Sequence, residues 1–151
     1  MAKFDEDAMR AALSPLVPEG TAITYAAYGV RQPSLWVILP AFAVAILPGV
    51  ILTQMLTKHY LVGLAGDRVV VMQFKPRMAK MTMAVGEVKD SFVQPLSEMQ
   101  GKPVTASTGK IFTNLGFPRP EGAFFAKFHR AFSKTNRPSA MAIAEAVQAA
   151  A

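Results

Sequence analysis

Few side chains in this chain have the type and spacing that a phosphate-binding motif requires. The segment STGK at residues 107–110 is the closest match to a phosphate-binding loop. That loop needs a glycine five positions before its second glycine, and Ser or Thr directly after the lysine. Here the preceding glycine is Gly101, eight positions before Gly109, and Ile111 follows Lys110. The segment therefore predicts a hairpin turn.

Catalytic groups are also missing from the rest of the sequence. Ser91 and Ser133 have no evident base near them, and the carboxylates are scattered, so neither a nucleophile–base pair nor a carboxylate pair is indicated. The chain has no cysteine, which excludes thiolate chemistry and disulfides. His59 and His129 have no second ligand at metal-binding spacing. We expect no catalytic residues, no enzymatic activity, no cofactor and no metal site.

Positive charge is the main chemical feature of the second part of the chain. The formal net charge is +6, from 16 Lys and Arg against 10 Asp and Glu. Residues 58–151 have a net charge of +7, and residues 1–33 have a net charge of −1. Anionic lipid headgroups attract such a segment. Nucleic acid is not expected as a partner, because the charge is dispersed and not gathered in one patch.

The charge surrounds one long apolar run. Residues 34–56 span 23 positions without a charged side chain, or about 34 Å as a helix at roughly 1.5 Å per residue. That length matches a bilayer core of about 30 Å, so we expect a transmembrane segment over residues 34–57. Basic residues follow the run, and the positive-inside rule then places residues 58–151 on the cytoplasmic side of the cell inner membrane.

The prolines of the run leave its shape open. Pro40 and Pro48 each remove a backbone donor and would kink a helix. A single kinked span is the expectation. The alternative is a tight helical hairpin that turns at Pro48-Gly49, enters the bilayer and returns to the same side. A further alternative is that the run forms two buried strands, or a core helix, of a soluble fold.

The elements around the run follow from their periodicity. A short helix is expected at residues 3–14 and a strand at 21–30, and after residue 58 the period changes to two. A turn at residues 65–67 separates two strands, the second of which ends at 75–77, and further strands are expected at residues 78–85, 88–93, 104–107 and 110–115. Residues 121–133 fit a helix or a strand equally, and residues 138–150 fit a helix. Short strands with polar turns favour a small antiparallel barrel or sandwich.

Two segments carry a resemblance to a known family. A tyrosine-led strand, Tyr60–Leu64, precedes the turn and the aliphatic strand at Gly66–Val71, and the chain ends in a helix over residues 136–147. Over about residues 58–150 this pattern resembles the bacterial pleckstrin-homology-like domains found next to membrane segments. The resemblance implies a seven-stranded, strongly bent sheet capped by a helix, without catalytic activity.

The expected fold class is therefore α+β, with three parts. Residues 1–33 form an N-terminal helix and strand, residues 34–57 the kinked transmembrane helix, and residues 58–151 a small pleckstrin-homology-like barrel or sandwich capped by the C-terminal helix. The candidate lipid- or partner-binding residues are aromatic or basic residues in or after the run: Trp36, Lys58, Tyr60, Lys75, Arg77 and Lys80.

These observations lead to an expectation about function. We expect a non-enzymatic, membrane-anchored interaction or scaffold module, either an accessory subunit of a larger membrane protein complex or an anionic-lipid binder. Its partners would be membrane lipid and a membrane protein. The alternative is a carrier of lipid or a small ligand, built on a peripheral β-fold.

Overall fold

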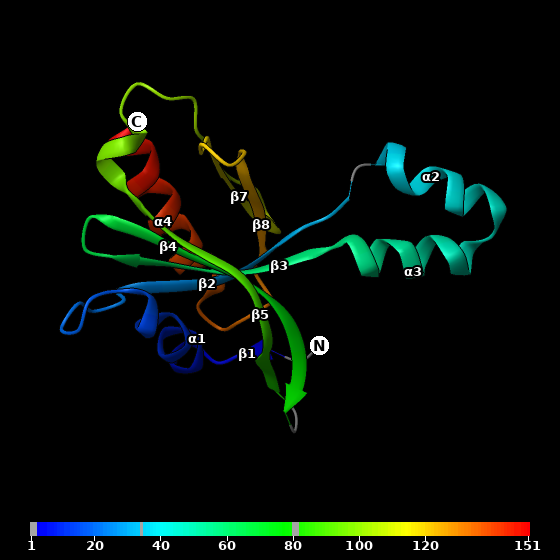
Figure 1. Ribbon diagram of the computed structural model, residues 1–151, viewed down its shortest axis with the longest axis horizontal. Helices are drawn as coiled ribbons and strands as arrows, with labels where there is room; N and C mark the ends of the chain where they lie inside the picture. Colours follow the sequence, from blue (N-terminus) through cyan, green and yellow to red (C-terminus); the bar gives the residue numbers. More distant parts are fainter. Residues whose placement is uncertain (1–2, 34, 80–81) are drawn as a thin grey trace.

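The computed structural model describes residues 3–33, 35–79 and 82–151, and its strands form one open sheet (Figure 1). The order of the strands is β1-β5-β4-β3-β2-β8-β7-β6. Their bounds are β1 Lys3–Phe4, β2 Tyr25–Arg31, β3 Lys58–Ala65, β4 Arg68–Ala79, β5 Thr82–Pro95, β6 Thr105–Thr108, β7 Phe112–Phe117 and β8 Phe124–His129. The helices are α1 Glu6–Leu13, α2 Leu35–Val44, α3 Ile46–Leu56 and α4 Asn136–Ala150, with short 3₁₀ turns at Ser14–Leu16 and Leu96–Met99.

The predicted hairpin after residue 58 is confirmed, and its second strand is longer than expected. β3 and β4 pair from His59↔Phe74 to Ala65↔Arg68, and Gly66 takes the positive φ of 61° that the turn requires. The expected end of the strand at residues 75–77 is wrong. β4 continues to Ala79 through an irregularity between Phe74 and Pro76, where a proline without an N–H is tolerated.

Residues 121–133, which the sequence left open between helix and strand, contain strand β8. Phe124, Ala126 and Phe128 are buried while Phe125 and Lys127 between them are exposed, so the burial has a period of two. These three side chains belong to one apolar core, and this packing favours the strand over the helix.

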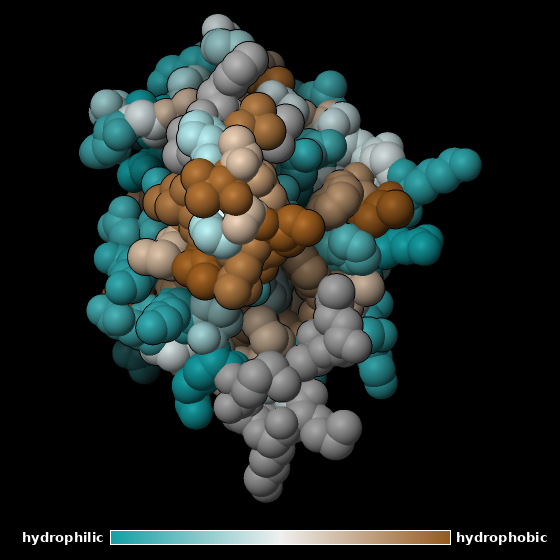
Figure 2. Space-filling view, turned by 90° about the vertical axis from the view of Figure 1, so that its right-hand side faces the viewer, coloured by the Kyte–Doolittle hydropathy of each residue, from teal (hydrophilic) through white to brown (hydrophobic). Residues whose placement is uncertain are grey.

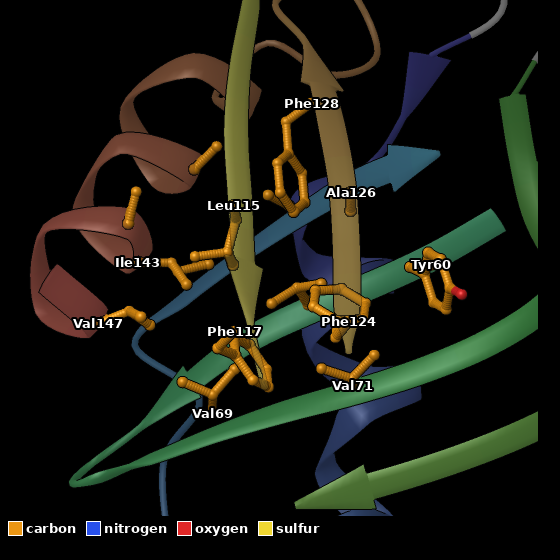
Figure 3. Packing of buried hydrophobic residues seen from close by; sticks show 14 of the residues in the cluster. Tyr60, Val69, Val71, Leu115, Phe117, Phe124, Ala126, Phe128, Ile143 and Val147 are labelled. Carbon is orange, nitrogen blue, oxygen red and sulfur yellow. The ribbon is translucent and has the colours of Figure 1, made fainter. Parts of the chain in front are cut away.

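Two apolar cores lie on the two faces of the sheet. Figure 3 shows the first, in which side chains of β7 and β8 meet Ile143 and Val147 of α4. The second core lies under α1, whose Met9 and Leu13 are fully buried against strands β2 to β4. Strand β2 thus contributes to both cores, and a strand enclosed on both faces is rigidly placed.

The apolar run forms a helical hairpin between two paired strands. α2 continues from β2, α3 leads into β3, and the two helices lie side by side beyond the sheet (Figure 1). The helix breaks at Ala45, which is extended at φ −167° and ψ 162°. A continuous helix would need the N–H of residue 48 for the carbonyl of Val44, and Pro48 has none. The turn therefore precedes the Pro48-Gly49 position that the hairpin alternative predicted.

The predicted transmembrane helix is wrong. Among the helices of the described residues, none is both long enough and apolar enough to cross a membrane. The placement in the inner membrane with a cytoplasmic β-domain depended on that helix and is corrected with it. The apolar composition of residues 34–57 predicted the span, but hydropathy does not show whether a helix is continuous. Here a single break at Ala45 divides the apolar run into α2 and α3.

The predicted barrel or sandwich is also wrong, although the class is α+β. The sheet is open and takes β1 and β2 from residues 1–33, with β2 between β3 and β8. Residues 58–151 are therefore not the self-contained sheet that the sequence had predicted, because period-two patterns show which residues form strands but not which strands become neighbours.

The side-chain amide of Asn136 joins the two halves of this sheet. β2 and β8 are in register only at Val30↔Lys127. Asn136, fully buried at the start of α4, accepts a hydrogen bond from the backbone N–H of Tyr28 at 2.7 Å. Its Nδ2 donates to the carbonyl of Tyr28 at 3.0 Å and to that of His129 at 2.8 Å. One side chain thus replaces the backbone ladder that β2 and β8 lack.

Replacing Asn136 by leucine should therefore destabilise the protein strongly. Asn136→Leu removes three hydrogen bonds and leaves buried backbone groups of Tyr28 unpaired, which should lower the free energy of unfolding by about 3 kcal/mol. Urea unfolding followed by circular dichroism measures this loss. Asn114→Leu is the matched control, because its exposed bond to Ser107 should cost less than about 0.5 kcal/mol. Equal losses in the two variants would contradict the bridging role.

Candidate functional site

The hairpin α2–α3 exposes an unusually apolar surface. No charged residue occurs between Arg31 and Lys58, and most large apolar side chains of the two helices face outward. The most exposed are Val44 at 82%, Ile46 at 77%, Met55 at 76% and Leu47 at 68%. Figure 2 looks onto the side from which the hairpin projects and shows a hydrophobic centre with hydrophilic residues around much of it. Such a patch marks an interaction surface.

The two threonine hydroxyl groups of the hairpin are hydrogen-bonded within it. Thr53 Oγ1 donates to the carbonyl of Gly49 at 2.8 Å, and Thr57 Oγ1 donates to that of Thr53 at 2.6 Å. Gly49 also sets the contact between the helices, since a Cβ there would collide with the ring of Phe42. The hairpin can therefore enter an apolar medium without leaving these hydroxyl groups unpaired.

Two cations stand where the hairpin joins the sheet. Arg31 is the last residue of β2, Lys58 is the first of β3, and the two are partners in the ladder. The Arg31 guanidinium donates to the carbonyl of Ala123 at 3.3 Å, which ties this end of β2 to the loop between β7 and β8. Positive charge is thus fixed at the base of the apolar surface.

Arg31 and Lys58 also line a cavity of about 370 Å³, which we call the cup. The other polar residues of its wall are Tyr60, Gln73, Asp90, Arg119 and Glu121. The Arg119 guanidinium lies 3.4 Å from the centre of the Phe92 ring, and its side chain is only 17% exposed. Glu121, 71% exposed, pairs with Arg119 at 3.3 Å.

The cup surrounds a buried phenol. Tyr60 is 6% exposed, and its ring packs edge-on against Phe124 at 4.9 Å. Burial raises the pKa of Tyr60 and Asp90 adds to the rise, while Arg31 and Arg119 oppose it. The phenol therefore stays protonated at neutral pH, and both guanidinium groups act on it through space.

The structure brings together only part of the predicted set of binding residues. Lys58 and Tyr60 share the cup, and Lys75 lies with Lys58 along a second cavity of about 660 Å³ beside α3. Arg77 is bound elsewhere, to the carbonyl of Val85 at 3.3 Å. Lys80 and the side chain of Trp36 lie outside the described residues.

Sequence reasoning missed Arg31 and Arg119 as members of the site. Arg31 carried a usable signal, because it flanks the apolar run on one side as Lys58 does on the other. Arg119 carried no such signal in the sequence, because its position in the cup depends on how the loop between β7 and β8 packs against the sheet.

An apolar groove of about 760 Å³ lies between the hairpin and strands β6 to β8. Ile38 and Pro33 form one side, and Leu115 and Ala126 form the other. Lys127 and Arg31 line it as well, so the groove combines an apolar lining with two cations.

The histidines take part in local packing contacts. His59 Nδ1 lies 2.7 Å from the hydroxyl of Tyr28, whose pKa burial raises to about 12, and the tautomer of His59 sets which of the two atoms donates. His129 Nδ1 accepts from the N–H of Ala131 at 3.0 Å. Within the described ranges, no three His, Cys, Asp or Glu side chains are grouped so that they could hold a metal ion.

Comparisons with protein-family models, with curated proteins and with solved structures find no match to the chain. The expected membership in the pleckstrin-homology-like family is therefore corrected. No family model supports it, and the adjacent transmembrane helix that accompanied it is missing from the described residues. The shared strand–turn–strand pattern is typical of many antiparallel hairpins and does not define a family.

The pair formed by Tyr28 and His59 should make stability depend on pH. Burial lowers the pKa of His59, so at acid pH the folded chain binds fewer protons there than the unfolded chain. The resulting stability is fully present above about pH 6.5, the unfolded value, and is lost as the pH falls through the folded pKa.

Urea unfolding at pH 7.5 and pH 5.0 tests this contribution. His59→Asn keeps an acceptor for Tyr28 and removes the titration, so the variant should lose less stability on acidification than the parent. Equal losses would show that other groups account for the acid sensitivity.

Proposed function

We propose that this protein is a non-enzymatic module that binds anionic lipid by embedding the α2–α3 hairpin in one leaflet of a membrane. The observation that carries the proposal is the hairpin itself, an uncharged projection whose large apolar side chains face outward. Water-exposed apolar area of this kind is costly, and lipid would remove it from water at about 25 cal/mol per Å².

The length of the hairpin supports insertion into one leaflet. α2 has 10 residues and α3 has 11, or about 15 to 16 Å at roughly 1.5 Å per residue. Half of a hydrocarbon core of about 30 Å has the same depth. With the turn at Ala45 near the bilayer centre, Arg31 and Lys58 would lie at the level of the lipid headgroups.

The backbone of the hairpin supports the same proposal. Apolar surroundings require paired backbone groups, which a helix supplies along its length but not at its ends. At the turn, the N–H of Ala45 donates to the carbonyl of Ala41 at 3.2 Å, and Pro48 has no N–H to leave unpaired. The free donors at this turn are thereby reduced to the N–H groups of Ile46 and Leu47, which no side chain caps.

Charge at the base of the hairpin explains the choice of anionic lipid. Arg31 and Lys58 end the two strands, and Lys75 and Lys127 line the cavities on either side of the helices. Each such cation near an anionic surface contributes about 1 kcal/mol to binding. A second candidate function, a carrier of a small lipid or ligand, is favoured by the apolar groove of about 760 Å³ beside the hairpin.

A charge at the tip of the hairpin should abolish lipid binding. Ile46→Asp places a carboxylate where the bilayer centre would be, at a cost of about 2.5–3.5 kcal/mol, so binding should weaken by about 100-fold. Co-sedimentation with vesicles of phosphatidylcholine and phosphatidylserine measures the change. Ile46 is 77% exposed, so the substitution removes little packing.

Ile111→Asp is the matched control, because Ile111 is 46% exposed in the turn between β6 and β7, outside the hairpin. It should bind vesicles as the parent does. Absence of vesicle binding by the parent would overturn the proposal. A lipid-free dimer that Ile46→Asp dissociates, without vesicle binding, would assign the hairpin to a second copy of the chain instead.

Removing a cation beside the hairpin should weaken binding only to charged lipid. Lys75→Gln should lower affinity for vesicles containing phosphatidylserine by about fivefold, because one attraction of about 1 kcal/mol is lost. Its affinity for pure phosphatidylcholine should not change. The difference should shrink as salt is raised, since exposed charges are screened. An equal loss on both kinds of vesicle would point to a packing defect.

A further inference from the structure

We infer that the cup at the base of the hairpin is a binding site for the phosphate group of a phosphate monoester. This inference deepens the proposed lipid binding and rests on it for the position of the cup at the membrane. The charged residues that line the cup determine which ligand it can bind.

Three cations converge on the cup from three parts of the chain. Arg31 comes from the end of β2, Lys58 from the start of β3 and Arg119 from the loop between β7 and β8. Arg31 and Arg119 line the same cavity as the Tyr60 phenol, so the two guanidinium groups lie around one space. A phosphate monoester carries nearly two negative charges and three free acceptor oxygens, and it pairs best with such a group of guanidinium and ammonium donors.

The cations of the cup are available to a ligand. In the described part of the chain, no carboxylate forms an ion pair with Arg31 or Lys58. The Arg119 guanidinium already lies against the Phe92 ring, 3.4 Å from its centre, in the absence of a ligand. A guanidinium that is already oriented loses little conformational entropy on binding.

Two carboxylates also line the cup, and both can coexist with an anion. Glu121 is the ion-pair partner of Arg119, but its side chain is 71% exposed and can turn into solvent when phosphate takes its place. Asp90 is exposed and accepts a hydrogen bond from the N–H of Ser91 at 2.8 Å, so solvent screens its charge. Glu121 would thus compete for Arg119 and weaken phosphate binding in the parent protein.

The size of the cup fits a headgroup and not a whole lipid. At about 370 Å³ it lies near the lower limit of small-molecule pockets, which measure roughly 300–1,000 Å³. Acyl chains attached to a bound phosphate would remain beside the hairpin. A soluble phosphate monoester offers the same chemistry, so the source of the phosphate has to be tested separately.

The first arm of the test uses a soluble probe. Glycerol 3-phosphate is titrated calorimetrically into the full chain and into three variants. Arg119→Gln should weaken its binding by roughly 10- to 100-fold, as expected for the loss of charge-assisted hydrogen bonds. Glu121→Gln should strengthen it severalfold by removing the competitor of Arg119. Arg130→Gln, an exposed charge outside the cup, should bind as the parent does.

The second arm uses vesicles. Phosphatidic acid, a phosphate monoester, is compared with phosphatidylserine, a diester, at matched surface charge. The parent should prefer phosphatidic acid, Arg119→Gln should lose that preference, and Glu121→Gln should increase it. If Arg119 only supported the fold, Arg119→Gln and Glu121→Gln would not change the preference for phosphatidic acid in opposite directions.

The outcomes separate this inference from the proposed function. Vesicle binding that depends on Ile46 but shows no preference for the monoester, and no effect of Arg119 or Glu121 in either arm, would overturn the cup alone. Glycerol 3-phosphate binding that depends on Arg119, without any vesicle binding, would support the cup for soluble phosphate esters and overturn lipid embedding. Equal losses in Arg119→Gln and Arg130→Gln would overturn the cup as the site.

Discussion

The structure depends on one buried side chain amide. Asn136 holds β2 beside β8, where the two strands are in register at Val30↔Lys127 alone, and it does so with three hydrogen bonds from the first turn of α4. Because this junction joins β2 to β8, the sheet is continuous and the core under α4 is closed on both sides. The loop between β7 and β8 reaches the end of β2 for the same reason. The cup is formed across the same junction, with Arg31, Lys58 and Tyr60 on one side and Arg119 on the other. Fold and candidate site therefore share a single structural requirement.

The hairpin places apolar surface and positive charge in a fixed order along one axis. Its two helices lie between strands that are paired at Arg31↔Lys58, so the ladder of β2 and β3 holds the two ends of the hairpin together. The apolar tip lies at one end of this order, the cations at the base follow, and the cup comes last. In the proposed lipid-bound state, this order would determine which residues of the sheet meet the headgroups.

Local patterns in the sequence were more reliable than long-range arrangements. One local expectation was wrong, since the two strands expected at residues 78–85 and 88–93 are the end of β4 and the single strand β5. The turn at residues 65–67, strands β2, β6 and β7 and the C-terminal helix follow from period-two patterns, glycine positions and an apolar helical face. The continuous helix over residues 34–57 failed because composition outweighed the missing donor of Pro48, whose effect falls four residues earlier. The barrel failed because nothing local shows that β2 lies between β3 and β8. Of the residues in the candidate site, the sequence predicted Lys58 and Tyr60. Arg31 flanks the apolar run as Lys58 does, so its position in the sequence also indicated the site. Arg119 could not be predicted, since its stacking on Phe92 depends on the complete sheet.

The separation of the bonded residues has a consequence for synthesis. Tyr28 and Asn136 are 108 positions apart, so the junction of β2 and β8 cannot form until residue 136 has left the ribosome. β2, the hairpin and β3 are contiguous and emerge much earlier. The nascent chain thus presents its most aggregation-prone surface before the domain that carries it can fold. Early contact with lipid, or with a chaperone that covers apolar helices, would shield the hairpin during that interval, and the yield of folded protein would then depend on where translation takes place.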